Sequence, residues 1–405
     1  MKRFPLALVV SLLGLYLISS GVSWAAFSYL KGKPQTSSMV GSSNGNLTID
    51  DSLPKTEQCP INGAMYSKPV REVWETRRPL TAMVENHVDA RPLSGISRAD
   101  VVYEAVAEGG ITRFLGVFYC NAAVSDFQLA VIRSARVYFI NWAAEYGEKP
   151  IFLHWGGANN ICNNCWGGVK EAGKIASEVD AFKLLDKIGW RNGTYGNDMD
   201  GQSNLGFPAL KRLPNRISNE KDAAIEHQPT AYINEVYKEA EKRGFVYKDE
   251  NGDSWSQNFR EWQFKDDSPV SDSKISDISF GFWENKGDYD VAWQYDGASN
   301  SYKRTSGGKP FVDLEYDNKQ IQVKNVLIQF VKERGPVDKE FHMNYDVVGK
   351  GEFVLFNNGT VTNGAWKKEG ITSRTLFFDD KGKEISFVRG MIWVEAVPSG
   401  SKIKY

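Results

Sequence analysis

A long uncharged stretch near the start of the chain constrains the compartment in which the rest of the protein folds. Residues 4–30 carry no charged side chain and follow the basic Lys2 and Arg3. About 20 apolar residues cross the hydrocarbon core of a bilayer, so this stretch is long enough for a transmembrane helix. The basic start favours a cytoplasmic N-terminus and a body on the other side of the membrane. A cleaved signal peptide ending in residues 23–26 (SWAA) is the alternative, and we predict the uncleaved anchor.

This expected location changes how the cysteines are interpreted. The chain has four, Cys59, Cys120, Cys162 and Cys165, and an even number in an exported protein predicts disulfides. Three connectivities are possible. A zinc site needs a second cysteine pair, and a redox C-x-x-C belongs at a helix start, whereas this one lies in a glycine-rich loop, HWGGANNICNNCWGG. We therefore predict no metal site and no cofactor, with Cys162–Cys165 and Cys59–Cys120 as the favoured disulfides.

Composition and length suggest how the 405 residues are divided. The net charge of −1 gives no support for nucleic-acid binding, which usually needs a basic excess. Residues 31–70 are rich in Ser, Gly, Asn and Thr and predict a flexible linker. At roughly 100–200 residues per domain, two folded parts follow, an N-terminal α/β domain at 71–220 and a C-terminal β-rich domain at 221–405.

Hydrophobic periodicity predicts mixed secondary structure in the N-terminal half. Apolar runs predict strands at 80–86, 112–119 and 150–157, and 99–107 fits either a strand or a short helix. Helices are predicted at 134–147, capped by Ser134, and at 179–190. A third helix at 230–244, capped by Thr230, joins the halves.

The C-terminal half alternates short apolar strands with turns. Strands are predicted at 290–296, 321–331, 352–356, 360–366, 374–378, 384–388 and 391–397. The sequences NNG at 357–359 and DDKG at 379–382 predict hairpin turns. The pattern predicts an antiparallel β-meander.

Several long motifs resemble the YerB-like family of bacterial envelope proteins. They are RPLTAMVENHVDARPLSGISRADVVYEAVAEGGITRF, IRSARVYFINWAAEYG, FLHWGGAN, YDGASNSYKR, GKPFVD, NVLIQF, GEFVLFNNGTVTNGAWKK and GMIWVEAVP. The resemblance covers about residues 77–398. It implies an α+β fold in which a mixed sheet is layered with a second sheet and helices, and in which the two halves pack into one compact unit. Together with the strand pattern, we expect a layered mixed sheet with helices in the N-terminal half and the antiparallel β-meander in the C-terminal half. The resemblance implies no activity. Family members often carry a lipid-anchoring cysteine, where this chain has a hydrophobic segment.

Three arginines and neighbouring carboxylates are the first candidates for a ligand site. Arg113, Arg133 and Arg136 are close enough in the sequence to clamp a phosphate or carboxylate, which guanidinium groups bind at two points. The alternative is that Arg113 and Arg136 form structural ion pairs with Glu104, Glu108 or Asp100.

Polar residues at strand ends supply the remaining candidates. Glu85 and Asn86 end a strand before His87, and Glu85, Glu104 or Glu108 would serve as a general base or metal ligand, or only neutralise the arginines. His154 precedes Gly156-Gly157 and is either an acid–base group or a packed strand residue. We expect His227 to be a structural cap, and His342 shows no partner in the sequence.

Two functions are consistent with these residues. The first is a membrane-anchored extracytoplasmic protein that binds a cell-wall glycan, an anionic polymer or an envelope protein through Glu85, Asn86, Glu108, Arg113, Arg133, Arg136 and His154. The alternative is a hydrolase or transferase acting on an envelope polymer, with Glu108 or Glu85, His154 and the arginines as its machinery. Convergence of these side chains in one cleft would favour the enzyme or a small-ligand site.

Overall fold

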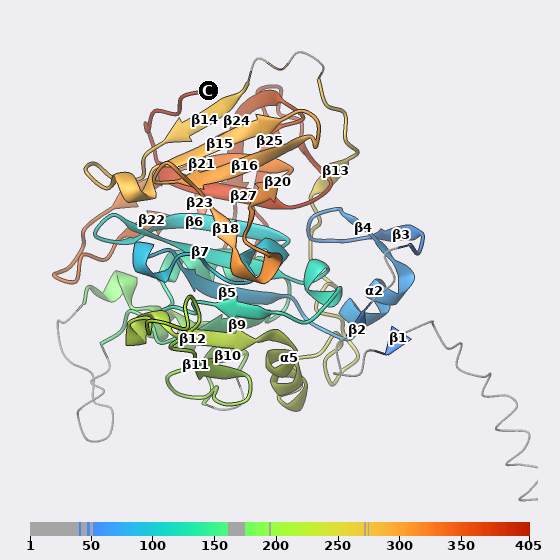
Figure 1. Cartoon of the computed structure of the whole chain (residues 1–405), viewed down its shortest axis with the longest axis vertical. Coiled ribbons are helices and arrows are strands. Elements are labelled where there is room, and N and C mark those ends of the chain that lie inside the picture. The colour runs from blue at the N-terminus through green and yellow to red at the C-terminus, as the bar shows by residue number, and fades with distance from the viewer. Residues whose placement is uncertain are drawn as a thin grey trace, which may run out of the picture. The chain divides into compact units, whose positions relative to one another are not determined.

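The computed structural model describes residues 52–160, 175–193, 196–270, 273 and 275–405, together with 40–41 and 47–48 (Figure 1). Two compact units are present, Met1–Asp50 and Asp51–Tyr405. In the first, β1 (Val40–Gly41) pairs antiparallel with β2 (Leu47–Thr48). No helix within the described ranges is long and apolar enough to cross a bilayer. The predicted anchor at residues 4–30 lies outside those ranges and stays a prediction.

The largest sheet among the described residues has 11 strands and contains strands from both predicted halves (Figure 1). Its N-terminal strands, in spatial order, are β10 (Asp198–Asp200), β9 (Ile151–His154), β5 (Leu80–Glu85), β7 (Ile111–Phe118) and β6 (Val101–Glu108). The order continues with β27 (Ile392–Pro398), β21 (Asn325–Arg334), β23 (Gly349–Asn357), β24 (Thr360–Lys368) and β25 (Leu376–Asp379), and β22 (Asn344–Asp346) pairs with the end of β21.

The strand directions make this a mixed sheet. β10, β9 and β5 are parallel to one another, and so are β6, β27 and β21, while the other pairs are antiparallel. The central strands β5, β6 and β27 are buried along almost their whole length. Nearly continuous apolar runs such as residues 101–107 (VVYEAVA), which only Glu104 interrupts, suit strands covered on both faces.

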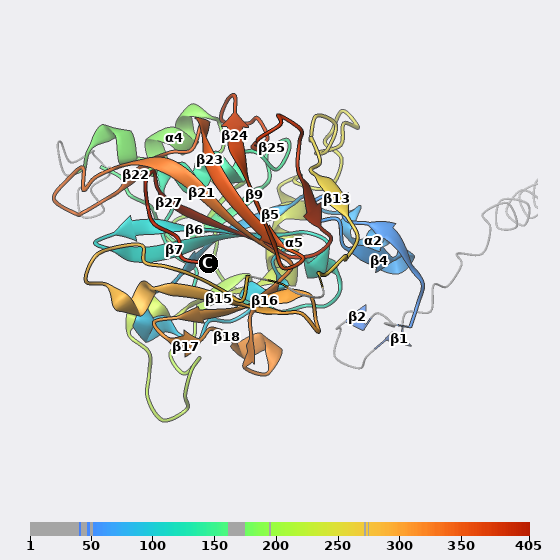
Figure 2. The ribbon, with the colours of Figure 1, turned by 90° about the horizontal axis from the view of Figure 1, so that it is seen from above.

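A second, antiparallel sheet covers one face of the large sheet. Its strands are β14 (Asp277–Phe280), β15 (Val291–Asp296), β16 (Ser301–Ser306), β17 (Lys309–Pro310) and β20 (Gln322–Val323). Trp293 of β15 packs edge-on against Trp393 of β27, with ring centroids 5.4 Å apart. On the other face, Tyr103 of β6 stacks on Trp142 at 5.0 Å. Figure 2 shows β15 and β16 on the opposite side of the large sheet from α4 (Ala181–Lys187).

Short elements complete the fold. Within the described ranges, the α-helices besides α4 are α2 (Lys68–Trp74), α3 (Val137–Ala143) and α5 (Ile233–Lys242). The small sheets are β8 (Gln128–Ala130) with β12 (Pro229–Tyr232) and β11 (Leu210–Arg212), β3 (Lys55–Gln58) with β4 (Met65–Ser67), β13 (Gln263–Lys265) with β26 (Ser386–Val388), and β18 (Val312–Asp313) with β19 (Lys319–Gln320).

The predicted α+β class with a β-rich C-terminal half is confirmed. The segment 99–107, for which the sequence allowed a strand or a short helix, forms strand β6. Strands β21, β23, β24 and β25 form the antiparallel meander, and both expected hairpin turns are present. The last strand departs from that pattern, because β27 lies parallel to both of its neighbours. The large sheet passes from one predicted half into the other, and the domain boundaries at residues 70 and 220 stay a prediction.

Two predicted helix starts are wrong, for the same physical reason. Ser134 caps no helix: residues 131–135 run extended beside β5, with the Arg133 amide donating to the carbonyl of Met83, and α3 begins only at Val137. Thr230 lies in β12, paired with Ala130, and α5 begins at Ile233. In both places pairing with a neighbouring strand outweighs the local capping preference.

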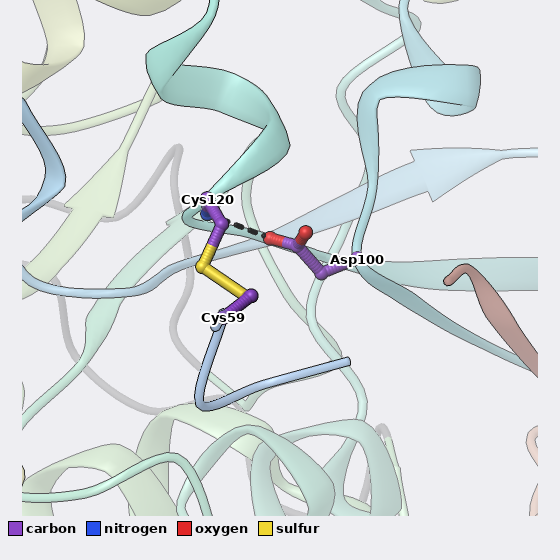
Figure 3. A group of neighbouring side chains, drawn as sticks. All are labelled: Cys59, Asp100 and Cys120. Atoms are coloured by element: carbon purple, nitrogen blue, oxygen red, sulfur yellow. Dashed lines mark hydrogen bonds between the residues drawn. A yellow bond between two sulfur atoms is a disulfide. The ribbon is translucent and has the colours of Figure 1, made fainter. Parts of the chain in front are cut away.

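The predicted disulfide between Cys59 and Cys120 is confirmed. Figure 3 shows it beside the buried carboxylate of Asp100, which accepts hydrogen bonds from the amides of Tyr119 and Cys120 at 2.7 and 3.0 Å. The side-chain amide of Asn62 donates to the same carboxylate at 2.9 Å. The bond therefore ties the segment before α2 to the end of β7. Cys162 and Cys165 lie outside the described residues.

A double Cys59→Ala, Cys120→Ala variant tests this tie. The two cysteines are 61 residues apart, and loop-closure entropy for that spacing predicts a loss of about 4 kcal/mol in the free energy of unfolding. Urea unfolding of the oxidised protein and the variant measures the difference. Equal midpoints would show that the disulfide contributes no stability.

A buried ionic cluster connects the second sheet to the large one. Arg304 of β16 donates to Glu104 of β6, its Nε lies 4.0 Å from Oε1 of Glu395 on β27, and all three side chains are fully buried. Burial and the nearby charge of Glu104 raise the pKa of Glu395 well above its ordinary range, against the opposing effect of Arg304. This shift favours the protonated form of Glu395, and the single cation of the cluster pairs with Glu104.

Aromatic rings surround that cation. The guanidinium of Arg304 lies 4.6–5.7 Å from the ring centroids of Phe311, Trp393, Trp293 and Phe114. The Trp293 indole donates to Oε1 of Glu395 at 2.9 Å. The aromatic faces stabilise the buried positive charge while excluding water from the Glu104–Arg304 pair.

Replacing Arg304 with Met should lower the free energy of unfolding by about 3–5 kcal/mol, because Glu104 would remain buried without a cation. Adding Glu104→Gln should recover part of that loss, since the remaining polar groups are then neutral. Chemical denaturation of both variants measures the two effects. A stable Arg304→Met variant would contradict the assigned role.

Candidate functional site

Five of the predicted site residues meet where β5 and β6 end and β7 begins. Glu85 is the last residue of β5 and pairs in register with Arg113 of β7, while Glu108 is the last residue of β6. The extended segment 131–135 passes the same strand ends and brings Arg133 beside Glu85. Glu85, Glu108, Arg113, Arg133 and Arg136 are called the arginine–carboxylate row below.

Within the row, each of the three arginines contacts a carboxylate. Arg133 Nε lies 2.9 Å from Glu85 Oε1, and Arg113 and Arg136 approach the two oxygens of Glu108 at 2.8 and 2.6 Å. Arg113 also donates to the carbonyl of Ser134 at 3.0 Å. The ion pairs that the sequence offered as an alternative for Arg113 and Arg136 therefore exist, and their partner is Glu108.

The row has a buried side and an accessible edge. The side chains of Glu85, Arg113 and Arg136 are buried, whereas Arg133 and Glu108 expose 25% and 29% of theirs. Burial lowers the pKa of Arg113 to about 10, which leaves it charged at neutral pH. A ligand from solvent would therefore meet Arg133 and Glu108 first.

The electrostatics of Glu108 oppose a role as a general base. Burial raises its pKa, but the charges of Arg113 and Arg136 and a hydrogen bond from Arg136 outweigh burial and hold the pKa well below its ordinary value. A general base works best with a pKa near the working pH. Glu108 is instead a permanently ionised partner for two buried cations.

Asn86 faces the interior and not the accessible edge of the row. Its side-chain amide donates to Thr112 Oγ1 at 2.7 Å and to Glu104 at 3.2 Å, and its oxygen accepts from Arg91. Asn86 therefore connects the end of β5 to the ionic cluster of Arg304, which was not evident from the sequence.

His154 belongs to a different cluster. Its fully buried ring contacts Asp198 of β10 through Nε2 and donates from Nδ1 to the carbonyl of Gly156 at 2.7 Å. Burial opposes a charge on the ring, but Asp198 and Asp200 outweigh burial and raise the pKa of His154. Arg191 bridges the same two aspartates at 2.6 and 3.2 Å. The structure thus does not bring the His154 side chain to the row.

His227 joins the row although the sequence suggested only a structural cap. Its Nδ1 lies 2.8 Å from Oε2 of Glu85, and its ring stacks on His87 with centroids 5.0 Å apart. A partial signal was present, because Glu85-Asn86-His87 and Glu226-His227 both place a carboxylate next to a histidine at a strand end. His342, which showed no partner in the sequence, contacts Asp338 at 2.9 Å.

Comparison with known proteins places the chain in a family. Residues 67–192 match the N-terminal domain, and residues 278–394 the C-terminal domain, of the protein of unknown function DUF3048. The chain belongs to this two-part, YerB-like family.

A curated relative and a solved structure agree with this assignment. The putative lipoprotein YerB of Bacillus subtilis is 28% identical over 351 residues, which cover 86% of this chain and 89% of the relative. The crystal structure of YerB from Bacillus subtilis superposes with a TM-score of 0.64 at 25% identity, covering 86% of this chain and all of that one.

Glu108→Gln should lower the free energy of unfolding at pH 7 by about 3 kcal/mol, because Arg113 and Arg136 would lose their shared anion. The folded-state pKa of Glu108 lies below the unfolded value of about 4.3, so its stabilisation is present above that pH and disappears as the pH falls. The difference between wild type and variant should therefore shrink below about pH 4.

Denaturant unfolding at pH 7 and pH 3 measures this difference. Glu220→Gln, which changes an exposed glutamate, is the control and should leave the stability within about 0.5 kcal/mol. A pH-independent difference for Glu108→Gln would contradict the assigned electrostatics.

Proposed function

We propose that this chain is an extracytoplasmic protein of the bacterial envelope, held at the membrane by residues 4–30, that binds an anionic envelope polymer at Arg133. Three features support the location: the uncharged N-terminal stretch, the Cys59–Cys120 disulfide, and a relative named a putative lipoprotein. The membrane is the partner of residues 4–30, and this anchor keeps the body of the protein near the cell wall.

The geometry of Arg133 carries the binding proposal. Glu85 holds its Nε at 2.9 Å, while the structure gives neither Nη atom a hydrogen-bond partner among the described residues. A guanidinium fixed on one side presents the Nη groups to solvent with little conformational freedom left to lose. Such a group binds phosphate or carboxylate oxygens at two points, which suits a polymer of phosphodiester or uronic acid units.

The contacts of Glu85 and Glu108 favour a binding protein over the hydrolase or transferase alternative. Glu108 is held ionised by two arginines, and Glu85 already contacts both Arg133 and His227. Neither carboxylate is placed to exchange a proton with a substrate in the way that a general acid or base must. Arg133 therefore acts as a fixed anion contact.

Arg133→Ala should weaken binding of a purified teichoic-acid-type wall polymer by about 10-fold, because one charge-assisted contact is lost. Isothermal titration of the full chain in detergent, at low and at physiological salt, measures the affinity. Arg133→Lys should retain only part of the binding, since an ammonium cannot form the two-point contact.

Arg71→Ala is the matched control. Arg71 is also an ion-paired surface arginine, but it lies on α2 and contacts Glu57 and Glu75. Its removal should leave the affinity unchanged. Equal affinities of wild type and Arg133→Ala, or no binding by the wild type, would refute the proposal.

A further inference from the structure

A second group of side chains lies on the outer side of Glu85. His87, Asp89 and His227 each offer one ligand atom, and these atoms lie within 4.8 Å of one another. His87 and Asp89 follow β5, whereas His227 precedes β12, so the fold brings together segments about 140 residues apart. This group is called the histidine pair site below.

Glu85 orients His227 for coordination. Its carboxylate lies 2.8 Å from Nδ1 of His227, which places the ring proton on that nitrogen and leaves Nε2 with a free lone pair. A metal-binding histidine characteristically donates its other ring N–H to a carboxylate. Arg133 in turn holds Glu85 from the other side, so the orienting group is itself fixed.

His87 and Asp89 are the two residues of the histidine pair site whose side chains can move to reach an ion. The Asp89 amide donates to Nδ1 of His87 at 3.2 Å, and Oδ2 of Asp89 lies 3.6 Å from the same nitrogen. The two imidazole rings are stacked at 18°, so their in-plane lone pairs run side by side and the His87 ring must turn to share an ion. Because His87 and Asp89 expose 29% and 74% of their side chains, this turn leaves the core undisturbed.

The charges around the site suit a dication. With both imidazoles neutral, Glu85, Asp89 and Glu226 carry three negative charges against the two positive charges of Arg133 and Arg216, which both interact with Glu85. Glu226 is exposed and lies in the electrostatic field of His227, Arg133 and His87. The net charge of these groups is therefore −1, which favours the binding of a cation.

We infer that His87, Asp89 and His227 form a binding site for a divalent transition-metal ion of the zinc class. Two imidazoles and one carboxylate select such an ion over magnesium or calcium, which prefer all-oxygen ligands. Three protein ligands leave a fourth position open to water or to an anion. Zinc binding does not require the polymer, because none of the ligands of this site is Arg133.

Zinc titration of the chelator-treated full chain in detergent tests this site, with a chromophoric chelator as competitor. The wild type should bind one Zn²⁺ per chain at these residues, and His227→Ala should weaken that binding more than about 100-fold, because a direct ligand contributes more than its hydrogen-bond partner. Glu85→Gln should weaken binding about 10–100-fold. Cobalt substitution should give a visible absorption band typical of a nitrogen–oxygen tetrahedral site.

Two controls separate metal binding from folding and from the polymer. His87→Ala changes a partly exposed residue, so it should keep the far-UV spectrum and thermal midpoint while losing zinc. His342→Ala removes a histidine that contacts Asp338 instead, and it should bind zinc like the wild type. Arg133→Ala should keep the zinc site even if polymer binding fails. Unchanged zinc affinity in both His87→Ala and His227→Ala, or no zinc binding by the wild type, would overturn the inference.

Discussion

The rest of the structure depends on the insertion of β27 between β6 and β21. This strand comes from the end of the described chain, yet it is parallel to strands from both halves and occupies the middle of the 11-stranded sheet. Until β27 pairs, β6 and β21 each lack a neighbour on one edge, and an open edge of buried apolar strands is unstable in water. The same insertion carries Glu395 into the core beside Glu104, and the buried charge of Glu104 is balanced by Arg304 from the second sheet.

The charged groups on β5, β6 and β7 follow from this burial. Glu104 and Glu108 lie on a strand covered on both faces, so each needs a partner, and each obtains one from a different segment: Arg304 for Glu104, Arg113 and Arg136 for Glu108. Most of the arginine–carboxylate row is therefore structural. Its accessible edge is formed by Arg133 and Glu108.

The sequence predicted most of the local secondary structure, but it missed several contacts between segments that lie far apart in the chain. Alternating apolar residues predicted the strands of the meander, and the expected export together with an even cysteine count favoured the Cys59–Cys120 bond among three possible connectivities. The parallel placement of β27 was not predicted, because a continuous apolar run fits many neighbours equally well. Contact between Glu85 and His227 was missed because 142 residues separate them, and the caps assigned to Ser134 and Thr230 failed where strand pairing prevailed.

Glu85 makes the two proposed sites interdependent, because one carboxylate holds Arg133 through one oxygen and His227 through the other. A dication on His227 would draw electron density from Glu85 through the imidazole and weaken its hold on Arg133. The metal would also add positive charge beside that guanidinium. Both changes strengthen the attraction of Arg133 for an anion. By thermodynamic linkage, a bound anion must then tighten the metal by the same factor. A metal and a polymer that bound independently would show that Glu85 does not couple the two sites.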